Sequence, residues 1–96
     1  MYAQLFTFNL GPGMRSKAEE IADKGFSMHK DMKGFKSITY IGNIEVGEYS
    51  SLSVWDSIED MKAAGEAMGP AMEKALSGIA KGAPSRKVFV VYEPKS

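Results

Sequence analysis

Short runs rich in apolar residues alternate along the chain with longer segments in which apolar residues recur every three or four positions. The four short runs are too brief for typical helices and are predicted to be strands. They cover residues 2–10, 36–42, 48–55 and 87–93. The two longer segments, residues 16–33 and 58–79, have the apolar spacing of amphipathic helices. The predicted order is therefore strand, helix, strand, strand, helix, strand.

Polar residues at the expected helix starts support this order. Ser16 is followed three residues later by Glu19, which is the capping-box pattern for the first helix. Either Asp56 or Ser57 is placed to cap the second helix. The acidic residues that complete that second box are Glu59 or Asp60. Both helices are thus expected to begin with side-chain caps.

The second helical segment contains Gly69-Pro70 in its interior. An interior proline removes one helix hydrogen bond and collides with the preceding turn, whereas proline suits the first turn of a new helix. We therefore expect this helix to be broken near Gly69-Pro70.

The two halves of the chain repeat one plan of strand, capped helix and strand. This is the ferredoxin-like α+β pattern, with a four-stranded antiparallel sheet and both helices on one face. Residues 1–96 are expected to form one domain. The strands carry apolar residues on both faces, so the face without helices needs a cover. We expect a second copy of the chain to provide it through a two-fold contact.

Composition narrows the classes of partner. The chain has 12 lysines and arginines and 12 aspartates and glutamates, a balance that argues against binding to nucleic acid or to anionic membranes. It has no cysteine and one histidine, and its carboxylates do not cluster, so no metal site is expected. No apolar stretch approaches the length of a membrane span, and no leader is evident, so the expected location is the cytoplasm.

One face of the third strand is a candidate pocket wall. Alternation places small hydroxyl residues between two aromatic ones on this face. The face consists of Tyr49, Ser51, Ser53 and Trp55. Beneath the helices the serines would leave a hollow, with Met61, Met68 and Met72 of the second helix as its lid. The alternative is that these methionines and the tryptophan only fill the core.

Two further polar residues have open roles. His29 near the end of the first helix either interacts favourably with that helix end at the surface or faces the pocket. Asn9 at the end of the first strand either caps the following turn or projects its amide into a cavity.

The whole chain resembles the antibiotic biosynthesis monooxygenase-like family of the dimeric α+β barrel superfamily. The resemblance rests on chain length, on the element order, on LSVWDSIEDM at 52–61 and on AMGPAM at 67–72. In that family a tryptophan, a polar residue and a serine often link the third strand to the next helix. The resemblance implies a homodimer in which each unit has a pocket between its sheet and its helices.

Relatives in that family oxidise polycyclic phenols or quinone precursors with molecular oxygen and without a metal or flavin cofactor. Others degrade haem with an asparagine, a tryptophan and a histidine, but residues 58–81, where that histidine belongs, contain none. The resemblance therefore implies a cofactor-independent monooxygenase for a small aromatic or quinone-type substrate. Trp55 would be the stacking wall, and Asn9, Tyr49 or His29 the polar partner. The alternative function is a non-catalytic ligand-binding or structural dimer.

Overall fold

A computed structural model describes residues 1–95 of the chain. The strands are β1 (Tyr2–Asn9), β2 (Phe35–Asn43), β3 (Glu48–Trp55) and β4 (Ser85–Val90), and the helices are α1 (Arg15–His29) and α2 (Ile58–Leu76). The predicted element order is confirmed, and the bounds of the first three strands lie within one residue of the prediction.

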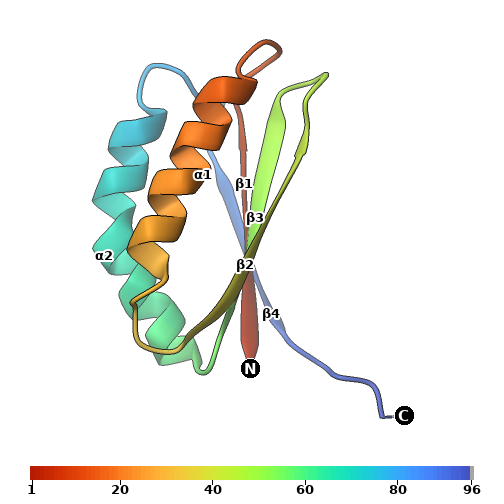
Figure 1. The fold of residues 1–96 in the computed structure, drawn as a ribbon, viewed down its shortest axis with the longest axis vertical. Helices are drawn as coiled ribbons and strands as arrows, with labels where there is room; N and C mark the ends of the chain where they lie inside the picture. The colour runs from red at the N-terminus through yellow and green to blue at the C-terminus, as the bar shows by residue number, and fades with distance from the viewer. Residues whose placement is uncertain (96) are drawn as a thin grey trace.

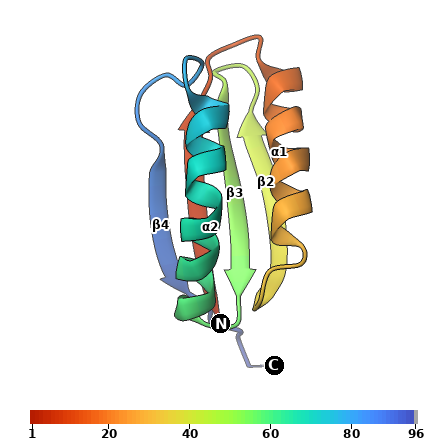
Figure 2. The same cartoon turned by 90° about the vertical axis from the view of Figure 1, so that its left-hand side faces the viewer.

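The four strands form one antiparallel sheet in the order β2-β3-β1-β4. Both helices lie on the same face of the sheet and leave the other face without a helix (Figure 1). Turned by 90°, the molecule shows α1 beside β2 and α2 over the centre of the sheet, while β4 stands to one side of α2 (Figure 2). The ferredoxin-like fold predicted from the sequence is confirmed.

Strand register decides which side chains share the helix-covered face. Tyr49 lies opposite Phe8 of β1 and Gly42 of β2, and Ser51 lies opposite Phe6 and Tyr40. Side chains two residues apart point to the same face of a sheet. The face predicted for β3 from its alternation therefore meets the aromatic residues of β1 and β2 beneath the helices.

Helix α1 begins one residue earlier than predicted, and the Ser16 capping box is wrong. Its cap residue is Met14, and no side chain caps the helix. Ser16 is already inside the first turn, so its hydroxyl cannot occupy the cap position, and Glu19 instead pairs with Arg15 at 3.1 Å between Oε2 and Nε. The helix ends at His29 rather than near residue 33, because the chain turns back to β2 through Gly34, whose φ is +80°.

Helix α2 is continuous through Pro70, so the predicted break is wrong. Pro70 is exposed, as is Glu66, whose carbonyl loses its helical donor to the proline. Water can satisfy an exposed carbonyl, which limits the cost of the missing bond. Met68 and Leu76 on either side are buried against the rest of the fold and hold both halves of the helix in line.

The predicted cap of α2 is confirmed for one of its two candidates. Ser57 has extended backbone angles, and its hydroxyl accepts a hydrogen bond from the Asp60 N–H at 3.1 Å. Glu59 and Asp60 lie in the first turn, where negative charge suits the helix dipole.

The core consists of two clusters. The larger one joins Phe6 and Phe8 of β1 to both helices and includes Leu10, Ala18, Ile21 and Leu76. The smaller one consists of Trp55, Met61 and Ala64. No helix within residues 1–95 has the length and apolar character needed to cross a bilayer.

Candidate functional site

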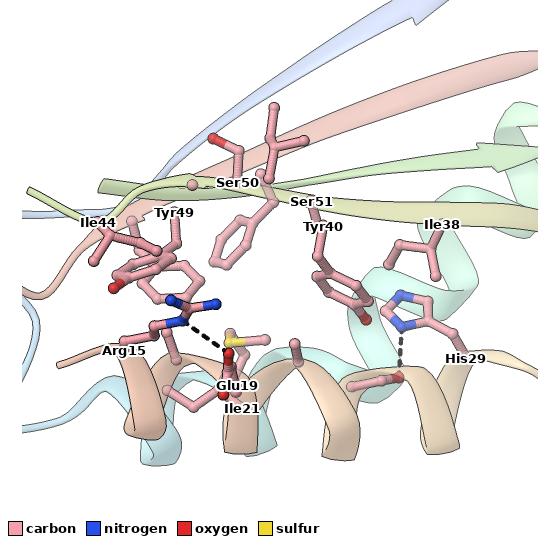
Figure 3. A pocket seen from close by; sticks show the side chains of 18 residues that line it. Arg15, Glu19, Ile21, His29, Ile38, Tyr40, Ile44, Tyr49, Ser50 and Ser51 are labelled. Atoms are coloured by element: carbon pink, nitrogen blue, oxygen red, sulfur yellow. Dashed lines mark hydrogen bonds and ion pairs between the residues drawn. The ribbon is translucent and has the colours of Figure 1, made fainter. Parts of the chain in front are cut away.

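A cavity of about 300 Å³ lies between α1 and the β2–β3 side of the sheet. Its volume is at the small end of the range for small-molecule sites. Most of its wall is apolar and comes from α1, β1 and β2, with Met72 of α2 closing one side. Figure 3 shows its polar side chains along the length of α1, from Arg15 at one end to His29 at the other. The polar lining residues are Arg15, Glu19, His29, Tyr40, Tyr49, Ser50 and Ser51.

His29 lines this cavity, and one of its two ring nitrogens has no hydrogen-bond partner among residues 1–95. Its Nδ1 lies 2.8 Å from the carbonyl oxygen of Gly25, one turn earlier in α1. A carbonyl only accepts, so Nδ1 carries the proton and donates it, which leaves Nε2 of the neutral ring as an acceptor. The ring is further held by Phe35 and Trp55, whose centroids lie 5.9 Å and 5.7 Å away.

Burial lowers the pKa of His29 below its ordinary value of 6.5, and the hydrogen bond to the Gly25 carbonyl opposes this to a smaller extent. Burial disfavours the charged imidazolium. The imidazole is therefore neutral at pH 7, and Nε2 is able to accept a proton.

Tyr40 of β2 brings a phenol to the same end of the cavity. A Cβ atom built on Gly25 would lie 3.3 Å from the Tyr40 hydroxyl oxygen, so the absence of a side chain at Gly25 leaves room for this hydroxyl. Burial raises the pKa of Tyr40, and the nearby Asp23 carboxylate raises it further. The phenol is therefore protonated at neutral pH and able to donate a hydrogen bond. Gly25 thus organises both groups, through its carbonyl and through its lack of a side chain.

Tyr49 lies at the other end of the cavity. In Figure 3 its side chain is at the same end as Arg15 and Ile44, far along α1 from His29. Its hydroxyl oxygen is buried and has no hydrogen-bond partner among residues 1–95. Buried polar atoms are nearly always paired, so this one calls for an explanation.

Trp55 is buried beside this cavity rather than in its wall. It is 1% exposed and packs against Met61 and Ala64. Its indole Nε1 donates to the Ser53 hydroxyl at 3.0 Å. Trp55 lines a second, much smaller cavity of about 50 Å³.

The residues predicted for the site divide between the two cavities. Tyr49 lines the larger cavity and not the smaller one, whereas Ser53, Met61 and Met68 line only the smaller cavity. Three of the predicted residues line both cavities, and these are His29, Ser51 and Met72. The structure therefore places His29 between Trp55 and the larger cavity.

Asn9 lies outside both cavities. Its Oδ1 accepts a hydrogen bond from the Gly11 N–H at 2.7 Å, so the side chain caps the turn that follows β1. Of the two roles open to Asn9 from the sequence, the structure shows the turn cap.

Sequence reasoning missed Tyr40, Gly25 and the Arg15–Glu19 pair as cavity residues. Alternation along residues 36–42 puts Tyr40 on one face with Ile38 and Gly42, but nothing in the sequence pairs that face with β3. A glycine inside a predicted amphipathic helix, at a position facing the sheet, is the one feature that could have indicated a gap at Gly25.

No family model and no curated protein matches this sequence. Solved structures do match its fold over almost its full length. A monooxygenase of Streptomyces coelicolor from the gene ActVA-Orf6, in complex with nanaomycin D, is 20% identical with a TM-score of 0.80 over 99% of this chain and 90% of its own. The N63A mutant of SnoaB, a cofactor-independent oxygenase from Streptomyces nogalater, is 14% identical to this chain. Its TM-score is 0.78, and the match covers 97% of this chain and 94% of the SnoaB chain.

A putative antibiotic biosynthesis monooxygenase from Nitrosomonas europaea has a TM-score of 0.83 at 8% identity, covering 99% of this chain and 93% of its own. Identities this low show a shared fold, and a shared fold alone does not fix an activity. The chain therefore has the fold of the antibiotic biosynthesis monooxygenases, as the resemblance in its sequence implied.

Proposed function

We propose that this protein is a cofactor-independent oxygenase that oxidises a small aromatic or quinone-type molecule in the cavity beside His29. The observation that carries the proposal is a neutral imidazole with a free Nε2 at the wall of an apolar cavity, with a phenol donor close by. A base with a pKa near or below neutrality, held in an apolar site, is suited to removing an acidic proton from a substrate. The fold shared with oxygenases that need no cofactor supports the same reaction class.

The substrate in this reaction supplies the electrons. Nε2 of His29 removes a proton from a CH₂ group made acidic by an aromatic ketone or phenol, which forms an enolate. The enolate carbon transfers electrons to O₂ and forms a C–O bond, giving a peroxide that takes the proton back from His29. Loss of the second C–H proton and cleavage of the O–O bond then produce a carbonyl and water. The balance is RH₂ + O₂ → R=O + H₂O.

The other cavity residues stabilise and shelter this sequence of steps. The Tyr40 phenol is placed to donate a hydrogen bond to the enolate oxygen, which favours charge development there. The Gly25 carbonyl holds His29 in the tautomer with Nε2 free. Apolar walls that include Phe6 and Phe8 exclude water from the enolate and its peroxide.

Oxygen uptake with anthrone, measured above the uncatalysed rate, tests the proposal. His29→Gln removes the base while it keeps a polar side chain of similar length, and general-base loss typically costs about 10²–10⁴-fold in turnover. Lys30→Gln, at the next and exposed position, is the matched control and should retain turnover. Wild-type turnover in His29→Gln would overturn the role of His29. Binding of anthrone without any oxygen uptake would instead favour the non-catalytic ligand-binding module.

The uncovered face of the sheet supports the proposal that two copies associate. Several apolar side chains on this face are exposed, including Ile41 at 57%, Phe89 at 47% and Leu52 at 39%. Pairing this face with itself through a two-fold axis would bury these side chains in both copies. Leu52→Lys should then give a monomer by light scattering at micromolar concentration. Val46→Lys, in the exposed β2–β3 turn, is the control. A wild-type protein that is monomeric under these conditions contradicts the proposal.

A further inference from the structure

A groove of about 660 Å³ lies between α2 and β4, where Figure 2 shows the strand standing to one side of the helix. Its volume is within the range of small-molecule sites. Its walls are mostly apolar and include Phe6, Met72 and Leu76. Only Phe6 and Met72 also line the cavity beside His29, so a ligand in the groove contacts a largely different set of residues. The proposed reaction makes no use of this groove.

Among the described residues, Arg86 of β4 is the one cation that lines the groove. Its guanidinium carbon lies 5.0 Å from the centroid of the Phe6 ring, which is a cation–π distance. Within residues 1–95 it forms no ion pair, whereas Arg15, the other arginine of the chain, is paired with Glu19. Arg86 is exposed, so a ligand in the groove can reach its N–H donors. The guanidinium is thus held on an aromatic ring with donors available to an anion.

Two glycines leave the α2 wall of the groove without side chains. Gly65 and Gly69 are one turn apart, about 6 Å along the helix axis. Gly69 precedes Pro70, whose ring crowds any side chain at that position. Gly65 has no such neighbour, and within 4 Å a Cβ atom there would meet only Nη1 of Arg86, at an ordinary contact distance of 3.8 Å. Alanine at 65 would therefore fit and would favour the helix. The fold does not need the bare backbone at Gly65, whereas a flat ligand lying against the helix would.

The charges around the groove indicate which class of anion it accepts. Glu66 and Glu73 also line the groove, and both are exposed to water. Their negative charges repel a phosphate or a dicarboxylate more strongly than a single carboxylate, because the repulsion grows with the charge of the ligand. A carboxylate also matches the planar fork of Arg86, which binds it through two parallel N–H···O bonds. The apolar walls suit an aromatic ring as the body of the ligand.

We propose that this groove is a second ligand site, which binds an aromatic monocarboxylate. The carboxylate pairs with Arg86, and the ring lies along the strip of bare backbone at Gly65 and Gly69. The site does not depend on the reaction proposed beside His29, and both sites can hold a ligand at the same time.

Isothermal titration calorimetry with 2-naphthoate and 2-naphthol at pH 7 tests this site. The two probes share one ring system, but only 2-naphthoate carries a carboxylate, whereas 2-naphthol is a neutral phenol of the kind proposed to bind beside His29. Wild-type protein should bind 2-naphthoate with the same affinity in the presence and in the absence of saturating 2-naphthol. Competition between the two probes, or no binding of 2-naphthoate, would overturn the second site.

Arg86→Gln removes the charge and the fork, and it should weaken 2-naphthoate binding about tenfold or more. The matched control is Lys87→Gln, which removes a positive charge from the opposite face of β4 and should keep the affinity. Arg15→Gln tests the other arginine, which lines the cavity beside His29, and should also keep the affinity. Wild-type affinity in Arg86→Gln, or a loss in Arg15→Gln alone, would overturn the role of Arg86.

Gly65→Ala separates binding from folding. The added methyl group should raise the urea midpoint, because alanine favours a helix interior over glycine, and it should weaken 2-naphthoate binding several-fold by occupying the strip. A loss of affinity in a more stable variant cannot be attributed to unfolding. Unchanged affinity for 2-naphthoate in Gly65→Ala would contradict the placement of the ring along α2. Absence of oxygen uptake on anthrone would contradict the proposed function and leave this site standing.

Discussion

Replacing Trp55 by phenylalanine tests whether the indole N–H is part of the structure of the core. The bond from Nε1 to the Ser53 hydroxyl is 3.0 Å long, and both residues are buried. Phenylalanine removes the donor and leaves Ser53 only its long contact of 3.5 Å with the Gln4 carbonyl. An unsatisfied buried group costs about 1–3 kcal/mol. The smaller ring adds a cavity cost of about 1 kcal/mol. We therefore expect Trp55→Phe to lose about 2–4 kcal/mol of the free energy of unfolding.

A double-mutant cycle with Ser53→Ala isolates the hydrogen bond. Removing both partners leaves no unpaired group, so the double variant should be about 1 kcal/mol more stable than the sum of the two single losses predicts. Urea unfolding should be followed by far-ultraviolet circular dichroism, because Trp55 is the only tryptophan and its replacement removes the fluorescence signal. Losses that add to within about 0.3 kcal/mol would refute the structural role of this bond.

Three further predictions concern the helices and His29. Burial lowers the pKa of His29, so the stability that its neutral form contributes is present above pH 6.5. This stability is lost as the pH falls through the pKa of His29 in the folded state. The urea midpoint should therefore fall less over this pH range in His29→Gln than in wild type. Pro70→Ala should restore the donor for the Glu66 carbonyl and raise the free energy of unfolding by about 2 kcal/mol, and an unchanged urea midpoint would contradict the account of α2. Gly25→Ala should weaken the binding of 2-naphthol, because the added methyl group crowds the Tyr40 hydroxyl. Gly69→Ala is the control and should leave binding unchanged, because a Cβ atom at this helical position has nothing within 4 Å. Equal affinities of the two variants for 2-naphthol would refute the role of Gly25.

The candidate site shows where reasoning from the sequence reaches its limit. Alternation along β3 predicts that Tyr49, Ser51, Ser53 and Trp55 share a face, and the register of the sheet agrees. Alternation cannot tell which part of that face a helix covers tightly. Met61 and Ala64 pack closely onto Trp55, whereas Gly25 leaves a gap opposite Tyr40, so the larger cavity lies beside Trp55, between α1 and the β2–β3 side of the sheet.

The sequence by itself determined the element order, the strand faces and the Ser57 cap, because periodicity and capping act within one element or a few residues. Only the tertiary structure decided the rest. It keeps α2 continuous through Pro70, because packing of Met68 and Leu76 outweighs one missing hydrogen bond. It also joins His29, Tyr40 and Tyr49 around one cavity, because that meeting depends on how α1 lies across β2 and β3. Contacts between elements far apart in the chain have no local pattern from which to read them.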